Sequence, residues 1–133
     1  MINRNYETKP RFFNVIKEPI IGKNCGLVNT LLDCADQIRI GDNVFFGHDV
    51  KILTSDHDYT VFGIERMKKV RTAPVIIDDG VWIATGVIIC KGVTIGTNAV
   101  VCAGSVVLKD IPLGEMWGGN PAKFIKKIWD LWN

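Results

Sequence analysis

The sequence contains no apolar run of the roughly 18–20 residues that a membrane-spanning helix needs, so no membrane span is expected. Residues 1–19 also lack an apolar stretch, so we expect no secretory signal and predict a cytoplasmic protein. The four cysteines show no CxxC spacing, which argues against a zinc knuckle and against a redox pair. With 16 basic and 14 acidic residues, the net charge of +2 offers no basic face for nucleic acid.

What the chain has instead is a period of six residues. Aliphatic residues recur at every sixth position at Ile77, Ile83, Ile89, Ile95, Val101 and Val107. Four positions after each one stands a second small or aliphatic residue, at Val81, Val87, Val93, Ala99, Ser105 and Ile111. An earlier block repeats the pattern at Ile40, Phe46 and Ile52, and a weaker one begins at Ile21 and Leu27. Ile21 and Ile40 are one residue further apart than a whole number of six-residue units, so the two blocks have different frames, which indicates an insertion of one residue between them.

A six-residue period fits neither the 3.6-residue repeat of a helix nor the two-residue alternation of an amphipathic strand. It is typical of a solenoid of short strands, in which each unit points one aliphatic side chain inward and stacks it on the next coil. Three units make one coil, so about twelve units predict an all-β solenoid of about four coils. The alternative is an ordinary β-sandwich with chance periodicity.

The repeat also predicts the organisation of the chain. Residues 1–20 show no sixes and are expected to form an irregular N-terminal lead-in or a cap. The β-helix is placed over residues 21–112, with an inserted loop at residues 55–74 where the sixes break. Residues 113–133 are expected to form a C-terminal loop and helix.

That C-terminal helix is predicted from its first residue and from one apolar face. Pro121 suits the first position of a helix. Phe124, Ile125, Ile128 and Trp132 would then share one face at 3.6-residue spacing. We therefore expect a short amphipathic helix that caps the end of the solenoid.

Three motifs stand among the repeats: Thr54-Ser55-Asp56-His57 before the loop, Val81-Trp82-Ile83, and Gly118-Gly119-Asn120-Pro121-Ala122-Lys123. Together with the sixes, they make roughly residues 20–128 resemble the hexapeptide-repeat acyltransferases. The nearest group is the maltose/galactoside O-acetyltransferase-like branch, which includes enzymes of surface-polysaccharide biosynthesis. The resemblance implies a left-handed parallel β-helix and a homotrimer that binds acetyl-CoA between its subunits, with no metal.

His57 is the candidate catalytic residue. Acetyl transfer from a thioester to a sugar hydroxyl needs a base for the hydroxyl proton, and a histidine can take that proton near neutral pH. His57 lies at the mouth of the loop, and the resemblance implies that it is this base; a solvated loop histidine is the alternative. His48, the other histidine, is expected at a corner of the coil and is not required by the family motif. The γ-class carbonic anhydrases share the repeat but hold zinc with three histidines, and this chain has two.

The resemblance also implies residues that bind the acceptor. Asp33 falls where family members place an acidic residue near the acceptor sugar, and Asn29 is given a similar part; an ordinary acidic turn residue is the alternative for Asp33. Asp56 and Asp58 flank His57, and either could orient the imidazole or cap the turn. The loop residues Arg66, Lys68, Lys69 and Arg71 could meet an acidic acceptor such as a nucleotide sugar, or could be solvated.

On the donor side, the resemblance implies that the pantetheine arm of the coenzyme lies beside Trp82, Ala84, Thr85, Ala103, Gly104 and Ser105. Lys123 is placed near the adenine and the 3′-phosphate, where a lysine supplies a flexible positive charge. Ala84 and Cys102 stand where family members have glycine, which predicts a narrower channel or a shifted thioester. Small residues at these positions are also what tight coil turns require.

Three functions are compatible with this pattern. The leading prediction is an acetyl-CoA-dependent O-acetyltransferase acting on a sugar or glycan precursor, with His57 as the general base. The alternatives are an N-acetyltransferase of an amino sugar and a non-catalytic β-helix scaffold. The motifs around His57, Trp82 and Asn120 argue against the scaffold, which would not need them.

Overall fold

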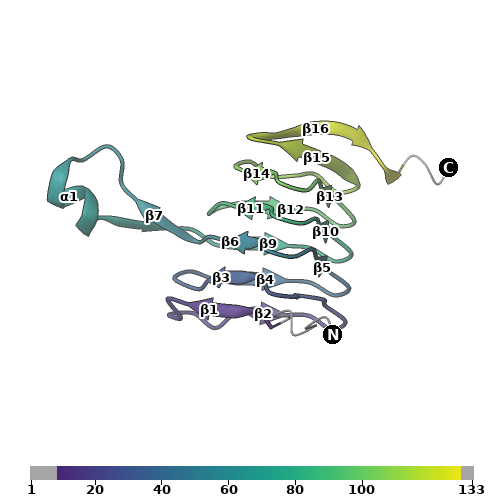
Figure 1. Ribbon diagram of the computed structural model, residues 1–133, viewed down its shortest axis with the longest axis horizontal. Coiled ribbons are helices and arrows are strands. Elements are labelled where there is room, and N and C mark those ends of the chain that lie inside the picture. The colour runs from purple at the N-terminus through teal and green to yellow at the C-terminus, as the bar shows by residue number, and fades with distance from the viewer. Residues whose placement is uncertain (1–8, 130–133) are drawn as a thin grey trace, which may run out of the picture.

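The chain forms a solenoid of short strands, and successive strands along the sequence join three different sheets in turn (Figure 1). The computed structural model describes residues 9–129. Sheet A contains, in spatial order, β1 (Arg11–Phe13), β3 (Leu31–Asp33), β6 (Lys51–Ile52), β11 (Ile88–Ile89) and β14 (Val106–Val107). Sheet B contains β2 (Ile20–Ile21), β4 (Ile38–Ile40), β9 (Val75–Ile77) and β12 (Thr94–Ile95). Sheet C contains β5 (Phe45–Phe46), β10 (Trp82–Ile83), β13 (Val100–Val101), β15 (Glu115–Gly119) and β16 (Ala122–Lys127).

The register of the strands gives the length of each coil. In the later coils Trp82 pairs with Val100, which is the eighteen-residue step that three six-residue units require. In the first coils Ile20 pairs with Arg39, nineteen residues later. In sheet A the step is twenty residues, since Arg11 pairs with Leu31 and Leu31 pairs with Lys51. The early coils are therefore one or two residues longer than the later ones, where the shift between the two sequence frames predicted one inserted residue.

The six-residue positions form the core. Both series named above, from Ile77 to Val107 and from Val81 to Ile111, are at most 1% exposed. The residues between them are partly or fully exposed, so each coil buries a narrow band of small and aliphatic side chains. At about 25 cal/mol per Å² of buried apolar surface, this repeated stacking is what favours the coil over an extended chain.

Three kinds of corner connect the sheets, and two of them matter for the site. The C–A corner comprises residues 27–30, 47–50, 84–87 and 102–105, which run from sheet C to sheet A. The A–B corner comprises residues 14–19, 34–37, 53–74 and 90–93, which run from sheet A to sheet B. Coils approach closely at the C–A corner, where a Cβ on Gly47 would lie 2.5 Å from the backbone nitrogen of Thr85.

Residues 55–72, here called the arm, leave the solenoid at the A–B corner and project away from it (Figure 1). The arm contains β7 (Ser55–His57) and β8 (Val70–Thr72), which pair antiparallel, and α1 (Gly63–Lys68) between them. None of the residues of α1 is buried. Within residues 9–129, no helix is long and apolar enough to span a membrane.

The N-terminal end of the solenoid lies earlier than predicted. β1 pairs in parallel with β3, with Arg11 opposite Leu31, so the prediction of an irregular lead-in over residues 1–20 is wrong for this part. β1 is the outermost strand of sheet A, and both Phe12 and Phe13 are exposed. Because this strand is held by its backbone ladder and not by buried aliphatic side chains, it leaves no six-residue signal in the sequence.

The predicted C-terminal helix is wrong for the described residues, because Ala122–Lys127 is strand β16; Trp132 lies outside the described residues. β16 pairs antiparallel with β15, which itself extends sheet C by pairing in parallel with β13. A short helix has little stability on its own, whereas a strand at this place forms hydrogen bonds with the backbone N–H and C=O groups on the free edge of β15. Phe124 and Ile125 remain about half exposed, so the supposed apolar face gains little burial.

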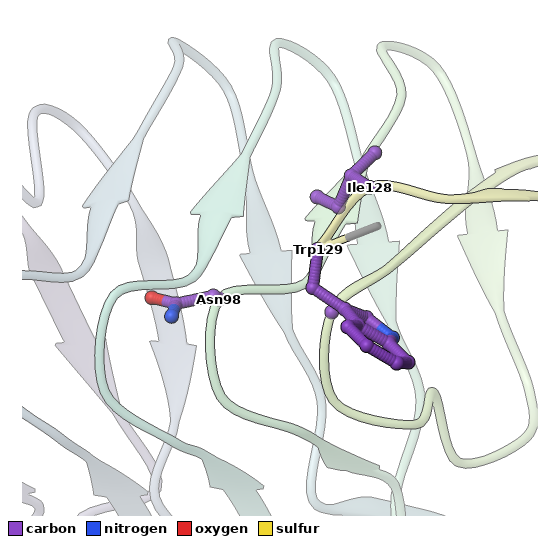
Figure 2. A pocket seen from close by; sticks show the side chains of 4 residues that line it. Asn98, Ile128 and Trp129 are labelled. Atoms are coloured by element: carbon purple, nitrogen blue, oxygen red, sulfur yellow. The ribbon is translucent and has the colours of Figure 1, made fainter. Parts of the chain in front are cut away.

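Beyond β16 the chain folds back over the last coil. The backbone nitrogen of Ile128 donates to the carbonyl of Gly114 at 2.8 Å. Trp129 lies so close to Gly114 that any side chain at that glycine would collide with the indole ring. With Asn98, these residues line a small cavity of about 100 Å³ (Figure 2), and none of the predicted site residues contributes to it.

Candidate active site

His57 lies at the root of the arm, at the end of β7 and opposite Val70 of β8. Its side chain is exposed, and its Nδ1 lies 2.9 Å from the carbonyl oxygen of Arg66 in α1. A carbonyl oxygen can only accept a hydrogen bond, so Nδ1 carries the proton and donates it. In the neutral ring this leaves the lone pair on Nε2, which is the form that a general base needs.

The two acidic neighbours of His57 are engaged elsewhere. Asp56 pairs with Lys91 at 3.3 Å and with Arg71 at 3.8 Å, which ties the arm to a later coil. Asp58 accepts hydrogen bonds from the hydroxyl and the backbone nitrogen of Thr60, and these bonds hold the pKa of its carboxyl below the usual value. Asp58 therefore caps the turn, and the group bonded to the imidazole is the Arg66 carbonyl.

Asp33 is 2% exposed and lies beneath the root of the arm. Its carboxylate accepts hydrogen bonds from the Ser55 hydroxyl at 2.5 Å, the Thr54 backbone nitrogen at 3.1 Å, the Asn14 side chain at 3.2 Å and the Ala35 backbone nitrogen at 3.3 Å. Burial by itself would raise the pKa of Asp33, but these four hydrogen bonds outweigh it and hold the pKa below the usual value. The carboxylate thus stays charged and holds Ser55, two residues before His57.

A surface cavity of about 440 Å³ opens beside His57 at the A–B corner. It is lined by residues of two successive coils and of the arm, namely Asn14, Ile16, Ala35, Ser55, Asp56, His57 and Val70. Arg71 packs over the ring of Tyr59 at 5.1 Å, so this loop cation helps to hold the arm together.

Asn29 lies at a different corner from His57. It is 6% exposed in the C–A corner, where its side chain exchanges two hydrogen bonds with Asp49 of the next coil, at 2.9 and 2.8 Å. His48 lies beside Asp49 and is exposed. Within one chain, therefore, His57 and Asp33 share one corner, and Asn29 and His48 share another.

The predicted donor residues gather along sheet C and the C–A corner. Trp82, Ala84, Thr85 and Ala103 line one cavity of about 420 Å³. Cys102, which the sequence analysis also connected with this channel, lines the same cavity; the lining residues that it missed are Gly47, Val100, Val101 and Met116. Trp82 is 42% exposed and stacks on Phe45 of the preceding coil, with ring centroids 5.8 Å apart and an interplanar angle of 11°. The sheet C cavity thus combines one broad aromatic face with small residues that leave room beside it.

Gly104 and Ser105 shape the same corner from behind. Gly104 has a φ of +73° and donates its backbone N–H to the carbonyl of Thr85 at 2.8 Å. Ser105 is buried; its hydroxyl donates to the Cys102 carbonyl at 2.6 Å and accepts from the Gly119 backbone nitrogen at 3.1 Å. Its hydroxyl therefore binds the corner to β15.

Cys102, at a position where the family resemblance implies glycine, is accommodated by the coil above. A Cβ on Gly118 would lie 2.9 Å from the Cβ and 3.2 Å from the sulfur of Cys102. The absence of a side chain at Gly118 therefore makes room for the thiol.

Lys123 lies on β16, exposed, at the rim of a further cavity of about 280 Å³. Trp117, Leu108 and Phe124 contribute the apolar part of this cavity, and Lys109 adds a second basic residue. Within residues 9–129, no group of three or more His, Cys, Asp and Glu is placed to hold a metal ion.

Comparisons with known proteins agree with this geometry. The family model described as bacterial transferase hexapeptide (six repeats) matches residues 74–109. A maltose O-acetyltransferase of Clostridium difficile has the same fold, with a TM-score of 0.78 and 39% identity over 90% of this chain and 64% of that one. Residues 74–109 thus carry the hexapeptide repeat of this transferase family, and the chain shares the fold of its acetyltransferases.

Two further relatives of this hexapeptide-repeat protein are named as acetyltransferases. A hexapeptide-repeat acetyltransferase of Vibrio cholerae, solved with acetyl-CoA, gives a TM-score of 0.77 and 33% identity over 83% of this chain and 60% of that one. A candidate acetyltransferase of Saccharomyces cerevisiae is 48% identical over 99 residues, which are 74% of this chain and 49% of the yeast protein. The chain thus spans about half the length of the curated relatives it matches.

Proposed function

We propose that this protein is an acetyl-CoA-dependent O-acetyltransferase acting on a sugar or glycan precursor, with His57 as the general base. The observation that carries the proposal is the hydrogen bond from His57 Nδ1–H to the Arg66 carbonyl, because it leaves Nε2 as the proton acceptor. This nitrogen belongs to an exposed ring that lines a cavity large enough for part of a sugar.

In the proposed reaction, the acceptor hydroxyl attacks the carbonyl carbon of the thioester. The new C–O bond forms as Nε2 of His57 takes the hydroxyl proton, and the C–S bond then breaks. The leaving thiolate takes the proton from the imidazolium, so that CoA leaves as a thiol and His57 returns to its neutral form. General base catalysis of this kind contributes about 10²–10⁴-fold.

The sheet C cavity supports the binding of the donor. The small residues Gly47, Ala84 and Ala103 leave space along the C–A corner, and Trp82 offers a flat apolar face. Lys123 adds a positive charge on β16, suited to a phosphate. These residues thus supply both the apolar and the charged contacts that a coenzyme with a long amide arm and phosphates would use.

We infer that the complete site is formed by two chains. His57 lies at the A–B corner and the sheet C cavity extends to the C–A corner of the same chain, on the other side of sheet A. A cyclic trimer of left-handed coils, as the family resemblance implies, would bring the A–B corner of one chain to the C–A corner of its neighbour and close without an open end.

The test is a thiol-release assay with acetyl-CoA over a panel of sugars, nucleotide sugars and amino sugars. The proposal predicts release that depends on an acceptor hydroxyl and yields an ester. Release that requires an acceptor amine and yields an amide would replace O-acetylation by N-acetylation. If no acceptor increases release above the rate without acceptor, and calorimetry detects no binding of acetyl-CoA, the acetyltransferase proposal is wrong.

A further inference from the structure

We infer that the Arg66 side chain is a positioning residue for His57: by fixing the fold of the arm, it holds its own carbonyl in place to orient the imidazole. The inference rests on the proposed role of His57 as the base. It concerns the guanidinium group, which does not itself touch the ring in the contacts that the structure shows.

The arm needs such a clamp because little else holds α1. None of its six residues is buried, and its N-cap residue Phe62 makes no side-chain capping hydrogen bond. A helix of this length is far below the roughly 12–15 residues at which an isolated helix becomes even marginally stable. Its position must therefore come from specific polar contacts.

Arg66 supplies these contacts. Its Nε donates to the carbonyl of Val61 at 2.9 Å, and its Nη2 donates to the carbonyl of Tyr59 at 3.1 Å. The guanidinium also lies over the ring of Phe62, 5.3 Å from the centroid. The side chain thus binds the segment before α1 to the last turn of α1, and closes the tip of the arm into a loop.

The carbonyl of the same residue completes the link. α1 ends at Lys68, so the carbonyl of Arg66 lies in the last turn, where helix carbonyls lack intrahelical partners. It accepts the Nδ1–H of His57 at 2.9 Å. One residue therefore connects the arm tip, through its side chain, to the imidazole, through its backbone.

A lysine cannot replace this arginine. The planar guanidinium binds two carbonyl oxygens and one ring face. The ammonium group of a lysine is a compact point charge and lacks the rigid, planar set of N–H donors that these contacts use. Both Arg66→Lys and Arg66→Ala should therefore loosen the tip while leaving the solenoid intact, because the residue is exposed and lies outside the core.

The experiment combines kinetics with nitrogen NMR of the imidazoles. We expect a fall in kcat of about 10-fold for Arg66→Lys and about 10–100-fold for Arg66→Ala, with an unchanged KM for acetyl-CoA, since misplacement of a catalytic group by about 1 Å can cost about 100-fold. In the His57→Ala background, Arg66→Ala should lower the residual activity no further, because the two residues act as one unit. Met67→Ala, which removes an exposed side chain next to Arg66 in α1, is the control and should keep wild-type kinetics.

The spectroscopic readout separates this inference from the proposed function. The chain has two histidines, so ¹⁵N spectra contain two imidazoles, and a His48→Gln spectrum assigns them. At alkaline pH, wild-type His57 should be the Nδ1–H tautomer, and the Arg66 variants should show a mixture of both tautomers. An unchanged tautomer and an unchanged kcat in both Arg66 variants would overturn the inference. If the wild type transfers no acetyl group, the proposed function fails, while the tautomer change still decides whether Arg66 positions the ring.

Discussion

The proposed site, shared between two chains, predicts that two inactive variants should restore each other. His57→Ala removes the proposed base at the A–B corner and leaves the sheet C cavity untouched. Ala103→Trp fills the sheet C cavity from an exposed position outside the left-handed region of the backbone, so it should block the donor without disturbing the coils. Each homogeneous variant should be nearly inactive.

The magnitude of the recovery follows from the arrangement of the corners. In a trimer with one site at each interface, a site is intact when the arm comes from an Ala103→Trp chain and the cavity from a His57→Ala chain. With equal amounts of both chains and random assembly, about one site in four meets this condition, so about a quarter of wild-type kcat per site should return.

The assay is co-expression of the two variants in equal amounts, purification of all chains through one tag that both carry, and measurement of CoA release per chain. A chain with both substitutions, co-expressed with wild type, is the control: about a quarter of the activity indicates a shared site, and about a half indicates a site within one chain. A mixture of the single variants that stays as inactive as its parents would refute the two-chain arrangement.

Three further predictions concern single residues. His57→Ala should lower kcat by about 10²–10⁴-fold with an unchanged coenzyme dissociation constant, whereas His48→Ala should keep most of the turnover; the reverse result in steady-state kinetics would contradict the site. Because the pKa of Asp33 is lower in the folded state, its charge stabilises the fold above about pH 4, and this stabilisation is lost as the pH falls through the folded-state pKa. In urea unfolding at pH 7, Asp33→Asn should lower the free energy of unfolding by about 1–3 kcal/mol. At pH 3 the difference in this free energy between the variant and the wild type should be smaller. Burial raises the thiol pKa of Cys34 and of Cys90, and the negative charge of Asp33 raises the first further, as that of Asp56 raises the second. Both thiols should therefore react slowly with iodoacetamide in the native protein. In denaturant without reductant all four cysteines should react, and fewer than four reactive thiols would mean a disulfide.

The solenoid core was predictable because its physical requirement repeats along the chain. Each inward position faces the same narrow interior, so the same small set of side chains returns every sixth residue, and the structure buries every position of the two later series. The ends were not predictable in this way. β1 and β16 are strands because they add to the free edges of β3 and β15, and a free edge is a property of the folded neighbour, not of the segment itself.

The same distinction applies to the site. The position of His57 could be predicted because the repeat breaks there and the surrounding motif resembles a known family. Its hydrogen-bond partner could not, since the Arg66 group that accepts its proton is a backbone carbonyl, which every residue possesses. Nor could the sequence show that the carboxylate of Asp33 is surrounded by four donors, because Asn14 and Ser55 reach it only after three coils have stacked.

The contacts at the A–B corner separate the placement of His57 into two tasks. Asp33 binds Asn14 of the first coil and Thr54 and Ser55 of the third, so one buried carboxylate fixes the point at which the arm leaves the solenoid. That point sets the position of the His57 backbone, two residues further on, but a backbone position does not set the rotation or the tautomer of an exposed ring. The second task falls to the tip of the arm, where Arg66 presents its carbonyl to Nδ1. The proposed role of His57 needs both a rigid root and a clamped tip, because a base must be close to the hydroxyl proton and must also direct its lone pair toward it.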